Sequence, residues 1–434
     1  MAPQSATPLN AVDRWLLTAE DVARRVGLPG AFARNIHVNF RGRLDLRELQ
    51  AASDRLAARW PLITARLERA PRLAWVPTGR QRCQIRELTI DSDSEADLLR
   101  TINHLTAEPF HPESEDPVRL TVLHRPGGDD VLTMQFTHVL MDGHGAIGLL
   151  RQLLDPSQIP PPSDSVTTPT DVVDEMLARI SLRDRLRAVY RLMRQSHRPR
   201  PITLPLLMKR PKQLPVGHVT LRWIDETACA ALRERLEKIG PFANPSLALL
   251  ASGCRALSRH VPHQPGRVYE MMLPYDLRRG PYKRLLFQNL ATRIVLTARP
   301  DQLEDRDGLI RLFASQVRAQ IADTTSIAHL QLLTMAAKLD HWAPGLTRAL
   351  VRPRPRSLHG STWGEVLESG TVALGAVVDH YWSTAAVAPG AGVSLNIGKH
   401  GKRHLAVFMH TPLNLTDTQA ARLLDEWLED LYRP

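Results

Sequence analysis

The residues best suited to chemistry lie in one short segment, Met134–His144, where His138 precedes Asp142 and Gly143 by four and five positions. The unperturbed pKa of imidazole lies near neutrality, so a positioned histidine can take a proton from an incoming hydroxyl or amine. Asp142 need not touch a substrate, because a carboxylate one short turn later can fix that turn by pairing with a distant arginine. Gly143 permits the backbone path. The spacing therefore indicates a general base with a local structural partner.

The surrounding pattern predicts that His138 stands at the end of a β-strand. Apolar and polar residues alternate through Leu132–Thr137, which is the periodicity of a strand. Gly143 and Gly145 end that pattern, and the helix-like run Ala146–Leu154 follows. Taken alone, however, a His-x-x-x-Asp-Gly string more often marks a satisfied histidine beside an ordinary Asp-Gly turn.

The segment resembles the active-site signature of a superfamily of acyl-transfer proteins. This superfamily contains chloramphenicol acetyltransferase, nonribosomal peptide condensation domains, polyketide-associated acyltransferases and wax ester synthases. The motif of these proteins is His-His-x-x-x-Asp-Gly or His-x-x-x-Asp-Gly. Here Thr137 replaces the first histidine of the doubled form, and His138 keeps the place of the general base. The resemblance implies that Thr137 lines a substrate tunnel. A structural place is expected for His144, the second imidazole of the loop.

The first half of the chain carries further similarities to this superfamily. Pro8–Trp15 is similar to its opening segment, and Phe40–Leu49 to its first strand and the start of a long helix ending near residue 59. Arg59–Leu67 is similar to a condensation-domain pattern that follows this helix. Trp60 stands where the family often has histidine, and Thr64 where it often has arginine, so the arginine's structural role is lost or moved to a neighbour.

The second half supplies the residues that the resemblance assigns to the neighbourhood of His138. Met272–Arg279 is similar to a strand and Asp-Leu-Arg turn that bring an arginine to the motif aspartate. This implies Arg278 as the structural partner of Asp142, with Arg279 as the neighbouring alternative. Asn289 matches an asparagine that lines the family's channel, although the spacing to the next arginine is one residue short.

A turn at residues 360–364 resembles the family's crossover segment and would supply Ser361 and Trp363 to the tunnel. Trp363, like Asn289, can equally be a buried packing or turn residue. The backbone N–H of Gly143 and the hydroxyl of Ser361 or its neighbour Thr362 are candidate donors to an oxyanion.

The length of the chain and its proline-rich segments predict two domains. A chain of 434 residues exceeds the usual size of one core. Proline-rich segments at Asp155–Asp164 and Arg198–Pro215 suggest an N-terminal domain at 1–165, a linker with a basic helix at 166–215 and a C-terminal domain at 216–434. The resemblance implies an α/β fold, an α+β sandwich, in which two chloramphenicol-acetyltransferase-like domains form a V-shaped pseudo-dimer with a central tunnel.

The net charge of +11 invites a nucleic-acid hypothesis, but the arginines are spread along the chain and aromatic residues make up only 5%. Neither a zinc finger nor an RNA-recognition string occurs, so we expect no nucleic-acid partner. The basic cluster Arg183–Arg200 is expected to be a solvated helix face. An alternative use is docking of an acidic partner, such as an acyl or peptidyl carrier protein or the phosphates of coenzyme A.

Three further expectations concern metals, thiols and location. The 17 histidines are scattered without a His-Glu-x-x-His string or a Cys-x-x-Cys pair, so no metal is expected. Cys83, Cys229 and Cys254 are expected to be reduced thiols. The sequence has no apolar run long enough to span a bilayer and no basic-then-apolar signal pattern at its start. A cytoplasmic monomer is expected.

The chemistry that the resemblance implies is acyl transfer from a thioester to a hydroxyl or amine, by a stand-alone condensation-type enzyme of secondary metabolism or lipid assembly. His138 would be the general base. No cofactor would be bound permanently; acyl-coenzyme A or a phosphopantetheinyl carrier protein would be the co-substrate, and a small alcohol or amine the acceptor. The alternative is an inactive or repurposed protein, a docking partner or cyclase in a biosynthetic assembly line, which the replacement at Thr137 favours.

Overall fold

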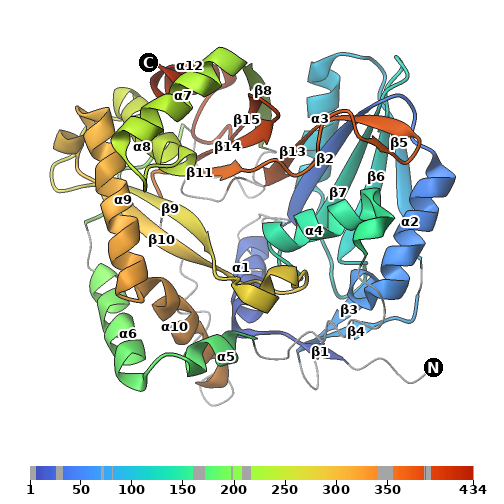
Figure 1. The fold of residues 1–434 in the computed structure, drawn as a ribbon, viewed down its shortest axis with the longest axis horizontal. Helices are drawn as coiled ribbons and strands as arrows, with labels where there is room; N and C mark the ends of the chain where they lie inside the picture. The colour runs from blue at the N-terminus through green and yellow to red at the C-terminus, as the bar shows by residue number, and fades with distance from the viewer. Residues whose placement is uncertain are drawn as a thin grey trace. The chain divides into compact units, whose positions relative to one another are not determined.

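The chain divides into two compact units whose sequence ranges interleave (Figure 1). The computed structural model describes residues 6–25, 33–69, 73–80, 82–159, 172–196, 199–207, 217–339, 355–385, 387 and 392–433. The first unit comprises Met1–Asp174, Arg278–Leu290 and Glu365–Ala386. The second unit comprises Glu175–Leu277, Ala291–Gly364 and Val387–Pro434.

Each unit is made of three separate sequence segments, whereas three consecutive segments were expected from the proline-rich stretches. Two pieces of the expected C-terminal domain 216–434, Arg278–Leu290 and Glu365–Ala386, pack with the first unit. Of the expected linker 166–215, the structure describes 172–196 and 199–207; the first of these ranges contains α5 (Val172–Ala178) and the basic helix α6 (Leu182–Ser196).

The first unit is built on a six-stranded sheet. All its neighbouring strands are antiparallel except β5 and β6, which are parallel. Its strand order is β12 (Val372–Ala373), β13 (Ala376–Ala385), β2 (Ala33–Arg41), β7 (Asp130–Thr137), β6 (Val118–His124) and β5 (Ile85–Thr89). A smaller sheet has the order β1 (Thr7–Pro8), β4 (Ala74–Pro77) and β3 (Ala65–Glu68). The helices of this unit are α1 (Ala11–Arg25), α2 (Leu46–Arg59), α3 (Glu95–Ala107) and α4 (Gly143–Leu154).

Strand β7, which carries the Thr137–His138 end, lies in the interior of this sheet. Strands β2 and β6 pair with its two edges, and all eight of its residues are buried, so the alternation seen in the sequence is not an alternation of core and solvent. Its polar side chains are satisfied internally. The hydroxyl of Thr133 lies 3.0 Å from Nδ1 of His37, and Gln135 donates to the carbonyl of Leu105 at 2.9 Å.

An antiparallel hairpin precedes the motif. The peptide N–H of Gly128 donates to the carbonyl of Arg125 at 3.1 Å, and Gly128 has a φ of 93°, in the region that favours glycine. The turn thus joins β6 to β7 directly and places the C-terminal end of β7 beside the start of β2, where Thr137 pairs with Ala33.

The second unit is a mixed six-stranded sheet covered by helices. In strand order it contains β10 (Ala291–Ala298), β9 (Tyr269–Asp276), β11 (Leu358–Trp363), β14 (Val393–His400), β15 (Arg403–His410) and β8 (His218–Ile224). Its helices are α6 and α7 (Glu226–Ile239), α8 (Pro245–His260), α9 (Arg306–Ala322), α10 (Thr325–Leu339) and α12 (Asp417–Tyr432). Helix α8 contacts α9, α12 and β11, so it is central to this core.

The terminal helix α12 is capped at its start and buries one apolar face. Thr416 is the N-cap, in a capping box with Gln419. Its apolar residues Leu423, Leu424, Trp427, Leu428 and Leu431 are all buried. The indole N–H of Trp427 donates to the carbonyl of Leu249 at 2.8 Å. A Cβ at Gly253 would lie 2.4 Å from the indole ring, so glycine lets α8 approach it.

The three cysteines are free and buried, as expected for reduced thiols. Among the described residues, the helices include none with the length and apolarity needed to cross a membrane.

Candidate functional site

His138 follows β7 directly and lies in a short turn that its neighbour shapes. The Thr137 hydroxyl accepts a hydrogen bond from the N–H of Val139 at 3.3 Å, and its carbonyl accepts one from the N–H of Leu140 at 3.1 Å. Thr137 is 4% exposed. The residue that replaces the first histidine of the doubled motif therefore holds the turn through its hydroxyl.

Asp142 is the N-cap of α4 and a buried anion with three donors. One carboxylate oxygen, Oδ1, accepts from the N–H of Gly145 at 3.1 Å. The other, Oδ2, accepts from Nη1 of Arg278 at 2.8 Å and from the N–H of Leu290 at 3.1 Å. The carboxylate therefore binds the start of α4 to the segment Arg278–Leu290.

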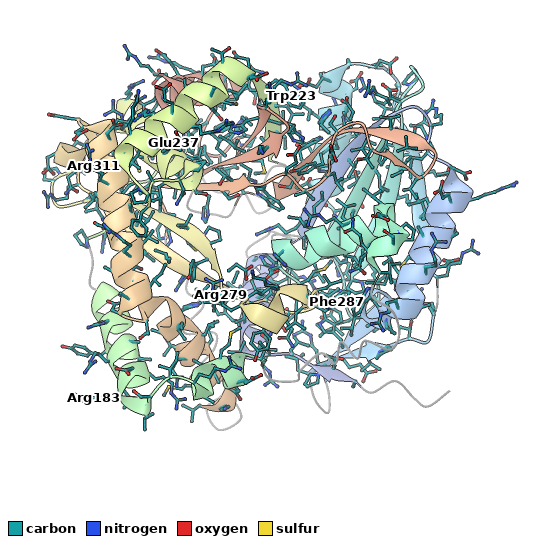
Figure 2. The ribbon with its side chains drawn as sticks, viewed as in Figure 1. Arg183, Trp223, Glu237, Arg279, Phe287 and Arg311 are labelled. Carbon is teal, nitrogen blue, oxygen red and sulfur yellow. The ribbon has the colours of Figure 1, made fainter. Side chains whose placement is uncertain are left out.

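Arg278, 1% exposed, is the arginine that meets Asp142. Its Nε donates to the carbonyl of Leu285 at 3.2 Å and its Nη2 to that of Gln288 at 2.9 Å, so the guanidinium also folds its own segment. Arg279, the alternative partner, is exposed, and its Nη1 donates to the carbonyl of Arg278 at 2.8 Å. The short 3-10 helix Gly280–Arg284 lies in this segment, and Figure 2 shows Arg279 and Phe287 on its two sides.

Asn289 is buried and connects three parts of the first unit. Its Nδ2 donates to the carbonyl of His138 and to Oδ1 of Asp13, each at 2.8 Å. A side chain expected to line a channel thus fixes the peptide of the candidate base. Asp13, a carboxylate on the buried face of α1, was not among the site residues expected from the sequence, although it lies within Pro8–Trp15. An acid among the apolar positions of that helix was the available signal.

Glycine is required here at Gly145, where a Cβ would lie 1.9 Å from the carbonyl oxygen of Leu286. The segment Arg278–Leu290 therefore packs against the first turn of α4 closely enough to exclude any other residue. Gly143, to which the sequence analysis assigned the backbone path, is the first residue of α4. Its N–H belongs to the group of helix N-terminal amides that no intrahelical carbonyl satisfies.

The departures from the family pattern after α2 have defined contacts. Trp60 packs against the ring of Phe287, with 5.6 Å between centroids, and its indole donates to Gln152 at 2.7 Å. The Thr64 hydroxyl donates to a backbone carbonyl at 2.9 Å, and Arg66 pairs with Asp116 at 2.7 Å. Trp60 therefore supports the same segment that carries Arg278.

Burial keeps the imidazole of His138 neutral. The pKa of His138 falls to about 4, first because burial penalises the imidazolium and then because the Arg34 cation opposes it. The Asp142 carboxylate acts in the other direction, to raise that pKa, as do the backbone of His138 itself and the side chain of Asn289. At neutral pH the side chain is a base that can accept a proton.

Burial has the opposite effect on Asp13. It raises the pKa of this carboxyl to about 7, although the hydrogen bonds from Asn289 and from the N–H of Asn10 lower it. The two titratable groups that contact Asn289, directly or through the His138 carbonyl, therefore have pKa values displaced in opposite directions.

The remaining candidates have local partners. His144 is exposed, and the carbonyl of Lys283 accepts a hydrogen bond from its Nε2 at 3.1 Å, which fits the structural place expected for it. Ser361 and Trp363 lie on β11 in the second unit: Trp363 donates to the Ser361 hydroxyl at 3.1 Å, which donates to Asn396 at 2.8 Å. The Thr362 hydroxyl lies 2.5 Å from that of Ser246. Their place in a tunnel stays a prediction.

Replacing Arg278 by alanine is expected to destabilise the fold by about 3–5 kcal/mol, because it leaves the Asp142 carboxylate buried without its cation. Arg279→Ala is the matched control and should cost less than about 1 kcal/mol, as expected for an exposed side chain. Urea unfolding of both variants measures the difference. Equal losses for the two arginines would contradict the anchoring role of Arg278.

Asp13 should make stability fall as the pH rises from about 4 to about 7. In that window the folded chain keeps a proton that the unfolded chain has released, and a shift from 3.8 to about 7 corresponds to at most about 4 kcal/mol. Asp13→Asn keeps an acceptor oxygen but removes the titration. The variant should therefore lose less stability than the wild type between pH 5 and pH 8 in urea unfolding. Parallel losses would rule out a raised pKa at this position.

The comparisons with known proteins agree with this geometry at the level of the fold. No family model and no curated relative matches the chain. The first condensation domain of the calcium-dependent antibiotic synthetase, in complex with a substrate analogue, is similar with a TM-score of 0.74 and 15% identity, over 99% of this chain and 96% of that one.

Two other solved structures widen the range of this similarity. A mutant starter condensation domain of rhizomide synthetase RzmA, in complex with C8-CoA and Leu-SNAC, has a TM-score of 0.69 and 12% identity, over 98% of this chain and 94% of that one. The EpoB cyclization-docking bidomain from Sorangium cellulosum has a TM-score of 0.70 and 14% identity, over 100% and 87%. The resemblance seen in the sequence and the expected α/β class are thereby confirmed: the chain has the fold of condensation domains.

Proposed function

We propose that this protein transfers an acyl group from a thioester to a hydroxyl or amine, with His138 as the general base. The observation that carries the proposal is an imidazole whose backbone is held by buried contacts. Asn289 binds the carbonyl of His138, and the buried pair of Asp142 and Arg278 fixes the chain four residues later. Such a fixed position is what proton transfer in a transition state requires.

The state of the imidazole suits a base that starts unprotonated. Nδ1 of His138 is buried without a hydrogen-bond partner among the described residues, and the groups that raise the pKa of the ring are the Asp142 carboxylate, its own backbone and Asn289. A proton on Nδ1 would leave Nε2 free to accept the proton of the attacking hydroxyl or amine. The attacking oxygen or nitrogen bonds to the thioester carbon, the carbon–sulfur bond breaks, and the proton held by Nε2 passes to the departing thiolate.

The start of α4 offers a stabilising group for the negative charge that develops on the thioester oxygen. Gly143 is the first residue of this helix, so its N–H has no intrahelical acceptor and lies at the positive end of the helix dipole. The Asp142 carboxylate is occupied by Arg278 and two backbone amides, which keeps its charge from opposing an oxyanion. We assign the oxyanion donor to Gly143 on this basis.

For the acyl donor, the proposal names a chemical class. One structure of similar fold is in complex with C8-CoA and Leu-SNAC, and another is the first condensation domain of the calcium-dependent antibiotic synthetase. We therefore propose an acyl-coenzyme A or a phosphopantetheinyl carrier protein as the donor class, and a small alcohol or amine as the acceptor. No resident cofactor enters any of these steps.

His138→Ala is expected to lower thioester-dependent product formation by about 10²- to 10⁴-fold, the contribution of a positioned general base. The control is His104→Ala, which removes an exposed imidazole from α3 of the same unit. Thiol release from a panel of acyl-coenzyme A donors, with an alcohol and amine pool, gives the rate. Product formation that persists unchanged in His138→Ala would exclude the assigned base.

A second assay separates an enzyme from a docking protein. Intact-mass measurement of an acylated carrier protein, with and without this chain and the acceptor pool, should show loss of the acyl group if the chain turns over. A carrier that binds but keeps its acyl group would instead support the non-catalytic alternative that Thr137 suggested.

The pH dependence gives an independent measurement on the base. Because burial lowers the pKa of His138 to about 4, the base form persists through mildly acidic pH. The value of kcat/KM should therefore fall on the acid side with a pKa near 4, instead of near the ordinary imidazole value of about 6.5. An acid limb centred near 6.5 in the wild type would show that the histidine is solvated in the free enzyme.

A further inference from the structure

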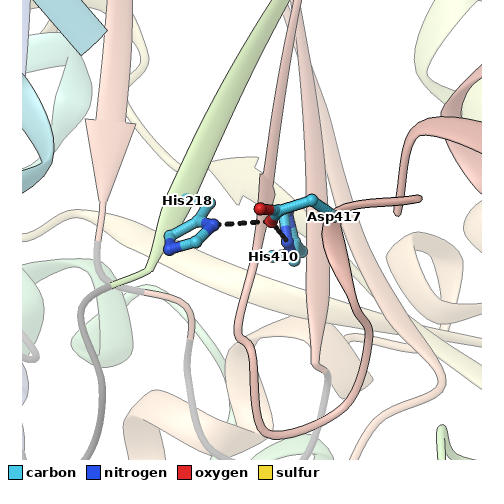
Figure 3. A group of neighbouring side chains, drawn as sticks. All are labelled: His218, His410 and Asp417. Atoms are coloured by element: carbon cyan, nitrogen blue, oxygen red, sulfur yellow. Dashed lines mark hydrogen bonds and ion pairs between the residues drawn. The ribbon is translucent and has the colours of Figure 1, made fainter. Parts of the chain in front are cut away.

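A second group of ligating side chains lies in the second unit, where Asp417 stands between two imidazoles (Figure 3). Oδ1 of Asp417 lies 2.7 Å from Nδ1 of His218 and 3.2 Å from Nε2 of His410. The three ligand atoms all lie within 4.8 Å of one another. None of these residues takes part in the proposed acyl transfer.

The fold brings together residues that are far apart in sequence. His218 is the first residue of β8 and His410 the last residue of β15, and the antiparallel register pairs them directly. Directly opposed residues point to the same face of a sheet, so the two imidazoles meet. Asp417 begins α12 seven residues after His410. Thr416 serves as the N-cap of that helix, which leaves the Asp417 side chain available.

The burial of the three side chains is graded from the sheet outward. His410 is 2% exposed, His218 is 42% exposed and Asp417 is 75% exposed. The ring of Phe408 stacks on His410 at 6.0 Å between centroids with an interplanar angle of 26°, which fixes the orientation of the buried imidazole. One ligand is therefore rigid, and the other two can adjust while leaving a side open to solvent.

The spacing of the three atoms suits a small divalent ion. A tetrahedral centre with bonds of about 2.0–2.1 Å to nitrogen and oxygen holds its ligand atoms about 3.3–3.4 Å apart. The separation of 3.2 Å between Asp417 and His410 is close to this value. The separation of 2.7 Å between Asp417 and His218 must widen by about 0.6 Å, which rotation of two solvent-exposed side chains allows.

The donor set selects the class of ion. Two imidazole nitrogens and one carboxylate oxygen suit Zn²⁺ and its neighbours among the divalent transition metals, whereas Ca²⁺ and Mg²⁺ take oxygen ligands. The buried Nδ1 of His410 has no hydrogen-bond partner among the described residues. A largely exposed carboxylate is thus the polar contact of this buried ring, and an ion would replace that contact by a stronger one.

We propose that His218, His410 and Asp417 form a binding site for a divalent transition-metal ion of the Zn²⁺ class, with solvent as the fourth ligand. The ion joins the end of the β8–β15 ribbon to the first turn of α12. Its role is structural, since a ligand that binds only the folded state stabilises it. No metal is expected from the sequence because His218 and His410 are far apart along the chain and form no metal-binding motif of short spacing.

The test uses the full chain, treated with a chelator and then titrated with Zn²⁺ alone in a calorimeter. Binding of one ion per chain is expected, with an increase in Tm that grows with the Zn²⁺ concentration. His218→Gln and Asp417→Asn keep polar groups but each remove a ligand, and either should weaken binding by on the order of 100-fold. His263→Gln, which removes an exposed histidine elsewhere in the second unit, is the matched control and should bind as the wild type does.

Two results would overturn the proposal. One is the absence of saturable Zn²⁺ binding by the wild type. The other is equal binding by the wild type and by both ligand variants, which would place the ion on scattered surface histidines. Circular dichroism and the Tm measured without metal show that each variant is folded. The avoidance of His410 in these variants keeps the core intact.

Discussion

The buried ion pair between Asp142 and Arg278 is the interaction on which the first unit's candidate site depends. Withdrawing two charges from water is costly, and the mutual attraction offsets that cost only when the remaining hydrogen-bonding positions are also satisfied. Here they are: the carboxylate accepts two backbone amides and the guanidinium donates to two carbonyls. Removing either partner would therefore strand several buried groups at once.

This pair determines how residues distant in sequence form one site. It binds the first turn of α4 to the segment Arg278–Leu290, and that segment carries Asn289 to the carbonyl of His138. The close approach excludes a side chain at Gly145. The turn from 138 to 142 is thus fixed at both ends by one inserted segment, so a change far from the imidazole can move it.

The motif could be predicted from a local pattern, and its arginine from a resemblance. Strand periodicity placed His138 at a strand end, and the family resemblance supplied Arg278. The role of Asn289 as a backbone donor could not be derived, since its partners Asp13 and His138 are separated from it by 276 and 151 positions. Nor did composition show that β13, near residue 380, would complete the first unit's sheet, because strand pairing across such distances leaves no periodic signal.

Thr137, the residue before His138, has a structural role in the turn. Its side chain is buried and its hydroxyl accepts the N–H of Val139, so this position shapes the turn that presents the next residue. Burial, followed by Arg34, lowers the pKa of His138, while Asp142, the backbone of His138 and Asn289 raise it. The small hydroxyl of Thr137 satisfies the backbone there without adding a second titratable ring, so the proposed proton transfer assigns its acceptor to His138 alone.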